Sequence, residues 1–507
     1  MTAAGISITW FRPLLRFTLI TLALAVSAEE ARSADPAGLA GLSKLGRLRT
    51  RQSEEIGGSR WGVSCHWIAD EHPLSVEKRL DQLSATGAKW ALLVPDWDRI
   101  EQAPGKYEWN TPTHRLDEVV DGLVRRKIAP VIQIYGGNRL YMPAVPDPNK
   151  RLLAEAAKLL EDHAVRDAWH RFIEALVRRY RAHVRYWEIW NEPNYEGFWS
   201  TPASIGDYGR LVKAAADVIK RAQPDAVILA GSTAGVPLDY LRTFLGTPGA
   251  GSFDHWSVHP YGELPEAADP SIRAVRELLR ASGKSAVLWQ SECGFPSSPD
   301  TGGWGFGGPW DETKHAKWVL RRLLSDAALD MRVSIYFVLY DYPALIEAGP
   351  DRGRMGINRK GLYSDSSWEP KPAARAFAHL SALLDDRFEP GDDSRPIRFD
   401  ITAKGSLPAA KEDLVRTYRL KHKASGQPML AYWLAVPMQT NFQPARATVT
   451  WPGPTVVRPV IVDLMDGGIY ALAHEIRPGT SNLEDLPLID SPLVLCSRDV
   501  VELAVKE

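Results

Sequence analysis

The sequence predicts an α/β protein in which a (β/α)8 TIM barrel is followed by a small antiparallel β-sandwich domain. Eight short apolar segments alternate with amphipathic helical segments between residues 57 and 385, and this alternation is typical of a parallel sheet. Eight repeats favour a closed barrel with long loops at its mouth. An open doubly wound sheet is the alternative, but the first strand lacks the Gly-rich phosphate turn expected there.

The chain divides into four parts in order. Residues 1–28 resemble an export signal, residues 29–56 a polar linker, residues 57–385 the barrel and residues 386–507 the β-sandwich. The expected barrel strands are 61–66, 89–94, 129–135, 185–191, 226–230, 255–259, 286–292 and 333–340. The expected helices include 116–126, 152–180, 208–222, 271–281, 312–328 and 372–384. In the last part, β-rich runs occupy 414–420, 429–435, 447–450, 456–463, 468–472 and 500–504.

The first 28 residues carry the features of a secretory leader. Arg12 and Arg16 precede the apolar run 17–28, which ends in the small residues of a cleavage site and is too short to span a membrane. We therefore expect a periplasmic or secreted protein with no membrane span after the leader is removed. An uncleaved anchor is the alternative.

Composition excludes several classes of partner and cofactor. The formal net charge is -1, from 61 basic and 62 acidic residues, which argues against nucleic acid or an anionic membrane as a partner. Cys65, Cys293 and Cys496 lie far apart without a metal-ligand pattern, so we expect no zinc site, no disulfide framework and no cofactor. The sequence favours no particular oligomeric state.

Two glutamates stand at the ends of predicted barrel strands. Pro193 cannot continue a strand, so we expect the fourth strand to end at Glu192. Glu292 takes the last position of the seventh strand, before Gly294. The carboxyl ends of parallel strands are where ligands bind, and two carboxylates there supply the acid and the nucleophile of glycoside cleavage. The alternative for Glu192 is a surface salt bridge or a charge at a helix start, and the alternative for Glu292 is a paired carboxylate at the rim.

The period of a strand predicts which side chains share a face. Residues two apart point the same way, so Glu188 and Trp190 are expected to share a side with Glu192, with Asn191 on the other side unless the strand end twists. Glu188, deeper in the barrel, is expected to be a paired structural carboxylate. By the same spacing, Gln290 shares a face with Glu292.

Several polar and aromatic residues near these strand ends are candidate ligands of a sugar. The Tyr261 hydroxyl is placed to donate to Glu292 and keep it ionised, with loop packing as the alternative. His259 is either a sugar ligand or a core histidine, and Asn191 either contacts a sugar hydroxyl or caps the next helix. The other candidates are His66 and Tyr340 on the first and last strands, and the rim aromatics Trp97 and Trp304. The Gly-rich loop 302–308, which holds Trp304, is expected to move over the cleft.

Trp190-Asn191-Glu192-Pro193, Ser291-Glu292-Cys293-Gly294 and His259-Pro260-Tyr261 together resemble the retaining (β/α)8-barrel glycoside hydrolase clan, with Asn-Glu on strand four and Glu on strand seven. The stretch from Trp97 to Trp109 looks like a loop motif of glycoside hydrolase family 39. The resemblance implies that Glu192 is the general acid/base, Glu292 the nucleophile, Asn191 the contact to the 2-hydroxyl and Tyr261 the donor to Glu292.

Two departures from that clan stand out. The second strand offers no arginine near the nucleophile, and Tyr340-Asp341-Tyr342 replaces the tryptophan common at the end of strand eight. We expect a retaining glycosidase acting on a β-linked oligo- or polysaccharide, such as a bacterial exopolysaccharide or a xyloside. A carbohydrate-binding barrel without turnover is the alternative. An aldolase or metal hydrolase is disfavoured because no strand ends in lysine and no His-rich ligand set exists.

Overall fold

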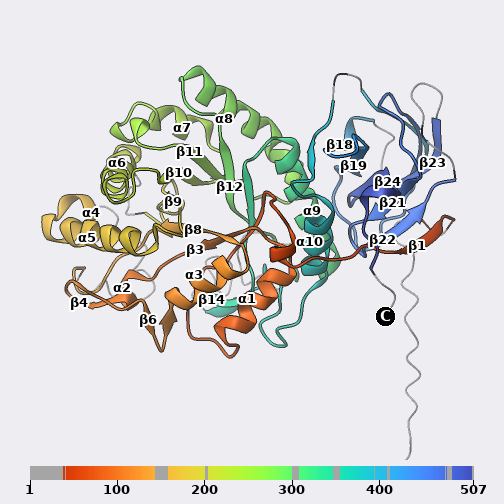
Figure 1. Cartoon of the computed structure of the whole chain (residues 1–507). Helices are drawn as coiled ribbons and strands as arrows, with labels where there is room; N and C mark the ends of the chain where they lie inside the picture. Colours follow the sequence, from red (N-terminus) through yellow and green to blue (C-terminus); the bar gives the residue numbers. More distant parts are fainter. Residues whose placement is uncertain are drawn as a thin grey trace, which may run out of the picture. The chain divides into compact units, whose positions relative to one another are not determined.

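The predicted (β/α)8 barrel is confirmed. The computed structural model describes residues 38–39, 41–142, 158–199, 204–299, 308–345, 354–392, 394, 396–407, 412–473, 476 and 482–504. Eight parallel strands close into a barrel (Figure 1). In chain order they are β2 (Trp61–Ser64), β3 (Trp90–Leu93), β8 (Ala129–Ile134), β9 (Tyr186–Ile189), β10 (Val227–Ala234), β11 (His255–His259), β12 (Leu288–Cys293) and β13 (Val333–Tyr336).

Helices follow the barrel strands, and their apolar faces pack against the sheet. They are α1 (Val76–Ala85), α2 (Trp97–Ile100), α3 (Leu116–Arg125), α4 (Lys158–Glu161), α5 (His163–Tyr180), α6 (Ile205–Ala222), α7 (Leu238–Phe244), α8 (Asp269–Ala281), α9 (Glu312–Ala328) and α10 (Pro372–Leu383). Five of them begin at a side chain that caps the free backbone N–H groups, as Ser and Asp do best: Ser75, Asp96, Asp162, Ser204 and Asp311.

Small hairpins decorate the loops that follow the second and eighth barrel strands. They pair β4 (Glu101–Ala103) with β5 (Lys106–Tyr107), β6 (Asn110–Thr111) with β7 (His114–Arg115), and β14 (Tyr342–Leu345) with β15 (Met355–Asn358). The last hairpin begins where the sequence predicted the end of the eighth strand. That strand stops at Tyr336 instead of residue 340, because the apolar residues after Tyr336 turn away into the loop that carries the hairpin.

The C-terminal part consists of two antiparallel sheets, as predicted. One sheet has the order β1-β22-β21-β24-β19-β18-β16 and the other β17-β20-β23. A shared core of buried apolar residues from both sheets, including Phe399, Leu430, Val449 and Leu486, lies between them. The strands are β16 (Phe388–Pro390), β17 (Arg398–Ala403), β18 (Val415–His422), β19 (Pro428–Leu434), β20 (Ala445–Thr450), β21 (Pro459–Asp463), β22 (Gly468–Ala471), β23 (Asn482–Leu488) and β24 (Leu493–Ser497).

Two expectations for this part differ from the structure. The segment read as a linker contributes β1 (Ser43–Arg47), which pairs antiparallel with β22 at the edge of the larger sheet (Figure 1). Its sequence is too short and too polar to predict a strand, because an edge strand buries few side chains. The run expected at 500–504 is not a strand but follows a 3-10 turn at Arg498–Val500.

Buried ion pairs join the barrel to the sandwich. Arg321 of α9 donates to both oxygens of Glu266, at 2.8 and 2.6 Å, and the Trp433 indole on β19 donates to the same carboxylate at 2.7 Å. Lys317, one turn earlier on α9, donates to Asp490 at 2.6 Å. Because each charge is paired and hydrogen-bonded away from water, this contact fixes the sandwich against one side of the barrel.

The three cysteines are buried free thiols. The predicted leader at residues 1–28 lies outside the described residues. Within the part of the chain that the structure describes, no helix combines the length and apolar character needed to cross a membrane.

Candidate active site

Glu192 reaches the barrel mouth through a tight turn. Strand β9 ends at Ile189, and Trp190 and Glu192 take left-handed φ angles of 70° and 41°. The prediction that the strand runs to Glu192 is therefore wrong. The turn is held because the Glu192 N–H donates to the Ser232 carbonyl at 2.9 Å, and the Trp190 indole donates to the Phe198 carbonyl at 2.7 Å.

The turn also changes which face Asn191 occupies. Gln133 on β8 donates to Asn191 Oδ1 at 3.2 Å and to Glu188 Oε2 at 3.1 Å, so Asn191 and Glu188 face the same interior. The strict alternation expected from the sequence fails here because the strand end twists. Glu188 is fully buried, and the Ser232 hydroxyl donates to its other oxygen at 2.5 Å. It is a paired carboxylate beneath the site, as predicted.

Glu292 is positioned by an irregularity in β12. The pairing of β12 with β13 shifts register between Gln290 and Cys293, and such a bulge re-aims side chains at a barrel rim. The consecutive side chains of Ser291 and Glu292 consequently both form hydrogen bonds, one with β11 and one with the turn after it. Ser291 Oγ bonds His259 at 3.1 Å, and Glu292 Oε1 accepts a 2.8 Å hydrogen bond from the Tyr261 hydroxyl. The contact expected between Tyr261 and Glu292 is thus present.

His259 connects the two strand ends. Its Nδ1 lies 2.9 Å from Glu192 Oε1, while its Nε2 lies 3.1 Å from Ser291 Oγ, which in turn lies 2.5 Å from Ser257 Oγ. Burial opposes protonation of this imidazole, but the hydrogen bond to Glu192 and the surrounding carboxylates outweigh burial and raise the pKa of His259. The contact with Glu192 therefore favours the protonated form of His259.

The two glutamates lie close together. One oxygen of each, with a ring nitrogen of His259, falls within a set of atoms no more than 4.8 Å apart. Glu192 and Glu292 are 8% and 9% exposed, so both carboxyls open onto the mouth through a narrow surface. Burial raises the pKa of Glu292, and the neighbouring Glu192 adds to the rise, whereas His259, the Tyr261 hydroxyl and Lys360 act in the opposite direction.

These three side chains are also the one set of potential metal ligands found among the described residues. Both ring nitrogens of His259 are already engaged, one by Glu192 and one by Ser291. The imidazole has no lone pair directed at an ion, so we assign no metal here.

His66 lies at the same rim. Its Nδ1 is 2.6 Å from Ser64 Oγ, and its ring is 5.4 Å from those of Phe337 and Trp67. Burial, with a smaller contribution from charge on His259, lowers the pKa of His66 to about 3. The side chain is therefore a neutral imidazole near the carboxylates. The exposed face of the neighbouring Trp67, 41% accessible, opens beside it.

The structure does not bring Trp97 to the site. Its indole is 2% exposed, donates to Glu101 at 2.6 Å and stacks on Tyr141 and Phe172, at 5.6 and 5.4 Å between ring centroids. It anchors the loop after β3 against α5. Both faces of the indole are covered by neighbouring side chains, so no face is free to contact a sugar.

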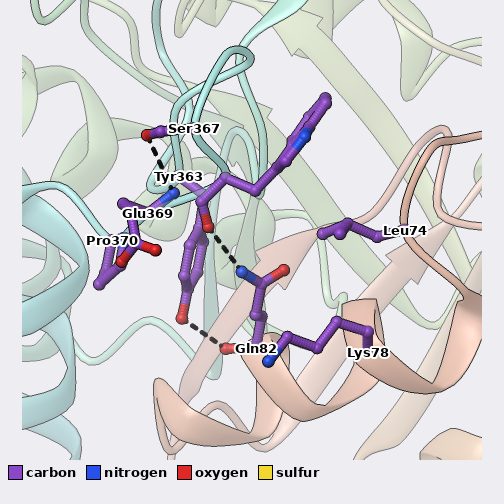
Figure 2. A pocket seen from close by; sticks show the side chains of 8 residues that line it. Leu74, Lys78, Gln82, Tyr363, Ser367, Glu369 and Pro370 are labelled. Atoms are coloured by element: carbon purple, nitrogen blue, oxygen red, sulfur yellow. Dashed lines mark hydrogen bonds between the residues drawn. The ribbon is translucent and has the colours of Figure 1, made fainter. Parts of the chain in front are cut away.

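Tyr340 also lies elsewhere. Its hydroxyl donates to the Gln82 side chain on α1, and its ring packs on those of His72 and Trp368. Gln82 and Trp368, which both contact Tyr340, line a hollow of about 340 Å³. Figure 2 shows this hollow, where the Tyr363 hydroxyl donates to the Gln82 carbonyl at 2.8 Å. Neither Glu192 nor Glu292 lines this hollow, which lies between α1 and the loop before α10. Trp304 and most of its loop lie outside the described residues.

Three residues at the site escaped the sequence reading. Phe337, at the true end of the eighth strand, is 6% exposed and packs edge-on against His66; reading that strand too long hid it. Gln133 had a usable signal, since it is a polar residue inside an otherwise apolar strand. Lys360 follows the β14–β15 hairpin, and nothing in the local sequence indicated that it returns to the mouth.

Comparison with known proteins supports this geometry. Residues 100–279 match the family model described as Glycosyl hydrolases family 39. The resemblance to family 39 is confirmed. The family 39 match includes Glu192 and Tyr261 and stops before Glu292. No curated protein matches the chain.

Solved structures resemble this chain in fold over most of its length. A monomeric β-xylosidase from Caulobacter crescentus CB15 has 17% sequence identity and a TM-score of 0.54, over 89% of this chain and 97% of that chain. The GH39 enzyme from Xanthomonas axonopodis pv. citri has 17% identity and a TM-score of 0.53, over 89% and 95%. An α-L-arabinofuranosidase from Thermotoga maritima has 12% identity and a TM-score of 0.53, over 89% and 97%. At these identities the likeness concerns the fold.

Proposed function

We propose that the protein is a retaining glycoside hydrolase that cleaves β-linked oligo- or polysaccharides by double displacement. The observation that carries this proposal is the short distance between the two carboxyl groups. One oxygen of Glu192, in the turn after β9, lies within 4.8 Å of one oxygen of Glu292, near the end of β12. Retaining enzymes hold their carboxyls about 5–5.5 Å apart, whereas inverting enzymes leave about 6.5–9.5 Å for a water molecule. The closer spacing favours direct attack on the sugar.

In the first step, a carboxylate oxygen of Glu292 forms a bond to the anomeric carbon while the glycosidic C–O bond breaks. Glu192 gives its proton to the departing oxygen. In the second step, Glu192 takes a proton from water, the water oxygen bonds to the anomeric carbon, and the ester to Glu292 breaks. The hydrogen bond from Tyr261 supports Glu292 as the ionised partner, and the contact from His259 orients Glu192.

The surrounding side chains suit a sugar ring at this position. The hydrogen bond from Gln133 engages Asn191 Oδ1, which leaves the amide nitrogen as a donor toward the 2-hydroxyl. The exposed indole of Trp67 offers an apolar face of the kind on which sugar rings stack. The solved β-xylosidase noted above makes xylosides the first substrates to examine, with bacterial exopolysaccharides next. A periplasmic or secreted location, proposed from the leader, suits a polymeric substrate.

The test is turnover of aryl β-glycosides and polysaccharides by the wild type, Glu192→Gln and Glu292→Gln. General acid–base catalysis alone contributes about 10²–10⁴-fold, so each variant is expected to lose at least that much. Azide is expected to restore turnover to Glu292→Gly. Glu277→Gln, on an exposed helix face, is the matched control and should keep full activity. Full activity in either site variant refutes the proposal, and sugar binding without turnover by the wild type supports the binding-protein alternative.

A further inference from the structure

A buried lysine lies beside the carboxylate pair. Lys360 is 7% exposed, and its Nζ lies 4.9 Å from the centroid of the Tyr261 ring and 5.9 Å from that of Phe337. The same Tyr261 donates its hydroxyl to Glu292. The ammonium group therefore shares one aromatic ring with the proposed nucleophile, in a setting where water screens charges poorly.

The backbone around Glu292 is shaped to admit this side chain. A Cβ added at Gly294 would lie 3.5 Å from Lys360 Cδ and 1.9 Å from the Phe337 carbonyl oxygen. Only a residue without a side chain fits there, and the aliphatic stem of the lysine passes over the space. The backbone of the lysine is fixed as well, because the Tyr336 hydroxyl donates to the Lys360 carbonyl at 2.6 Å.

We propose that Lys360 is a positioning residue whose buried ammonium group stabilises Glu292 in its ionised, nucleophilic form. It supplies the cation that the second barrel strand lacks, since residues 91–94 read Ala-Leu-Leu-Val. The lysine comes instead from the far side, after the hairpin that follows the eighth strand. The inference rests on the proposed function only in calling Glu292 a nucleophile.

Glu292 is surrounded by groups that raise its pKa and groups that lower it. Burial and the Glu192 carboxylate raise its pKa, while His259, the Tyr261 hydrogen bond and Lys360 lower it. Removing one of the stabilising cations is therefore expected to raise the pKa of Glu292 further, so that ionisation requires a higher pH. The titratable groups that face it are Glu192 after β9, His259 on β11, Tyr261 after β11, Tyr135 after β8, Cys293 on β12 and Lys360.

The decisive experiment titrates Glu292 directly. Protein labelled with ¹³C at the glutamate carboxyls is followed by NMR against pH, and the Glu292 signal is assigned by its loss in Glu292→Gln. In Lys360→Met, which keeps the aliphatic stem, the midpoint is expected to rise by about one pH unit, a tenfold change in the ionisation constant. Lys360→Arg should restore the wild-type midpoint. Lys284→Met is the matched control, since Lys284 also lies over an aromatic ring, Phe253, but far from the site.

Turnover gives the second readout. The acidic limb of kcat/KM for 4-nitrophenyl β-xyloside, or for whichever aryl β-glycoside the wild type hydrolyses, should shift to higher pH in Lys360→Met, with the alkaline limb unchanged. A midpoint of Glu292 that is the same in folded Lys360→Met as in the wild type, or an equal shift in Lys360→Met and Lys360→Arg, overturns the inference. A shifted midpoint in a protein that cleaves no glycoside supports the electrostatic pairing and instead contradicts the proposed function.

Discussion

Two residues of the same type receive different surroundings at this site. Glu192 meets an imidazole whose pKa is raised, and Glu292 meets a tyrosine hydroxyl with a lysine beyond it. A carboxyl that exchanges a proton and a carboxyl that must stay ionised need such unequal partners. The proposed roles of Glu192 as acid/base and Glu292 as nucleophile rest on these unequal neighbours.

Removing the donor to Glu292 tests this directly. Tyr261→Phe keeps the ring but deletes the 2.8 Å hydrogen bond. A hydrogen bond to a charged group is worth about 1.5–3 kcal/mol, so kcat/KM is expected to fall about 10- to 100-fold. The acidic limb should move to higher pH, because the pKa of Glu292 rises. Tyr432→Phe, whose buried hydroxyl has no partner in the described structure, is the control, and an unchanged pH profile in Tyr261→Phe contradicts the assignment.

The coupling between His259 and Glu192 predicts a measurable titration. Burial lowers the pKa of His259, and the hydrogen bond to Glu192 is the largest effect that raises it. In Glu192→Gln the negative partner is lost, so the imidazole should deprotonate at a lower pH than in the wild type. Nitrogen-15 NMR of the ring would report the change, and an unaltered midpoint would show that the contact is electrostatically inert.

Sequence reasoning was effective for the carboxylates and weak for their supports. Glu192 and Glu292 were visible because each ends an apolar run beside a chain-breaking residue. Trp97 was misassigned because an aromatic residue in a loop looks the same whether it stacks on a sugar or on Phe172. Lys360 was invisible, since its contact with the mouth depends on a hairpin whose path no local pattern encodes.

At the scale of elements, the strands that build the site are those that lose regularity. Strand β9 ends in left-handed turns, β10 shifts register between Ala230 and Thr233, and β12 shifts between Gln290 and Cys293. Bulges at barrel rims re-aim side chains. Here they allow consecutive residues, Asn191 with Glu192 and Ser291 with Glu292, to serve one mouth, which a strictly alternating strand does not permit.

The close approach of β12 and β13 predicts the effect of a single methyl group. Gly294→Ala would place a Cβ 1.9 Å from the Phe337 carbonyl oxygen, so the two strand ends must separate. We expect a loss of about 1–3 kcal/mol in the free energy of unfolding, measured by denaturant titration, together with a fall in turnover. Gly251→Ala, with nothing within 4 Å of the added atom, should change neither, and equal behaviour of the two variants would contradict this account.

The repeating elements were predictable because burial imposes a period on the apolar residues, and the exceptions have two opposite causes. Eight apolar runs located the barrel strands, although five of the ends were placed too late, by one residue at Leu93 and Ile134 and by two to four at Ser64, Ile189 and Tyr336. Apolar residues continue into the loops there because the mouth itself is packed. Strand β1 was missed for the opposite reason, since four of its five residues are exposed.

For the whole molecule, the contact between α9 and the sandwich is the strongest candidate for coupling the two parts. Breaking a buried ion pair by removing one partner costs about 3–5 kcal/mol, so Arg321→Met should lower the free energy of unfolding by that order at neutral pH. Adding Glu266→Leu should recover part of the loss. Arg280→Met breaks an exposed pair with Glu277 and should cost at most about 1 kcal/mol.

The same pair gives a pH dependence. Burial tends to raise the pKa of Glu266, but the charge and hydrogen bonds of Arg321, with the Trp433 indole, lower it overall. A depressed folded pKa stabilises above the ordinary value, 4.5, and this stabilisation is lost as the pH falls through the folded value. The difference in unfolding free energy between wild type and Glu266→Gln should therefore shrink in acid. A difference that stays constant with pH would contradict the lowered pKa.

The pairing of β1 with β22 joins Ser43 to Ala471, and Arg49 and Glu502 are joined nearby. On the ribosome β1 emerges long before β22 is translated, so the backbone N–H and C=O groups of β1 remain unpaired until then. A polypeptide cut short before residue 468 never acquires β22, whatever the state of its barrel. The larger sheet is therefore complete only in full-length chains. Prematurely terminated copies keep an unpaired strand that chaperones and proteases recognise.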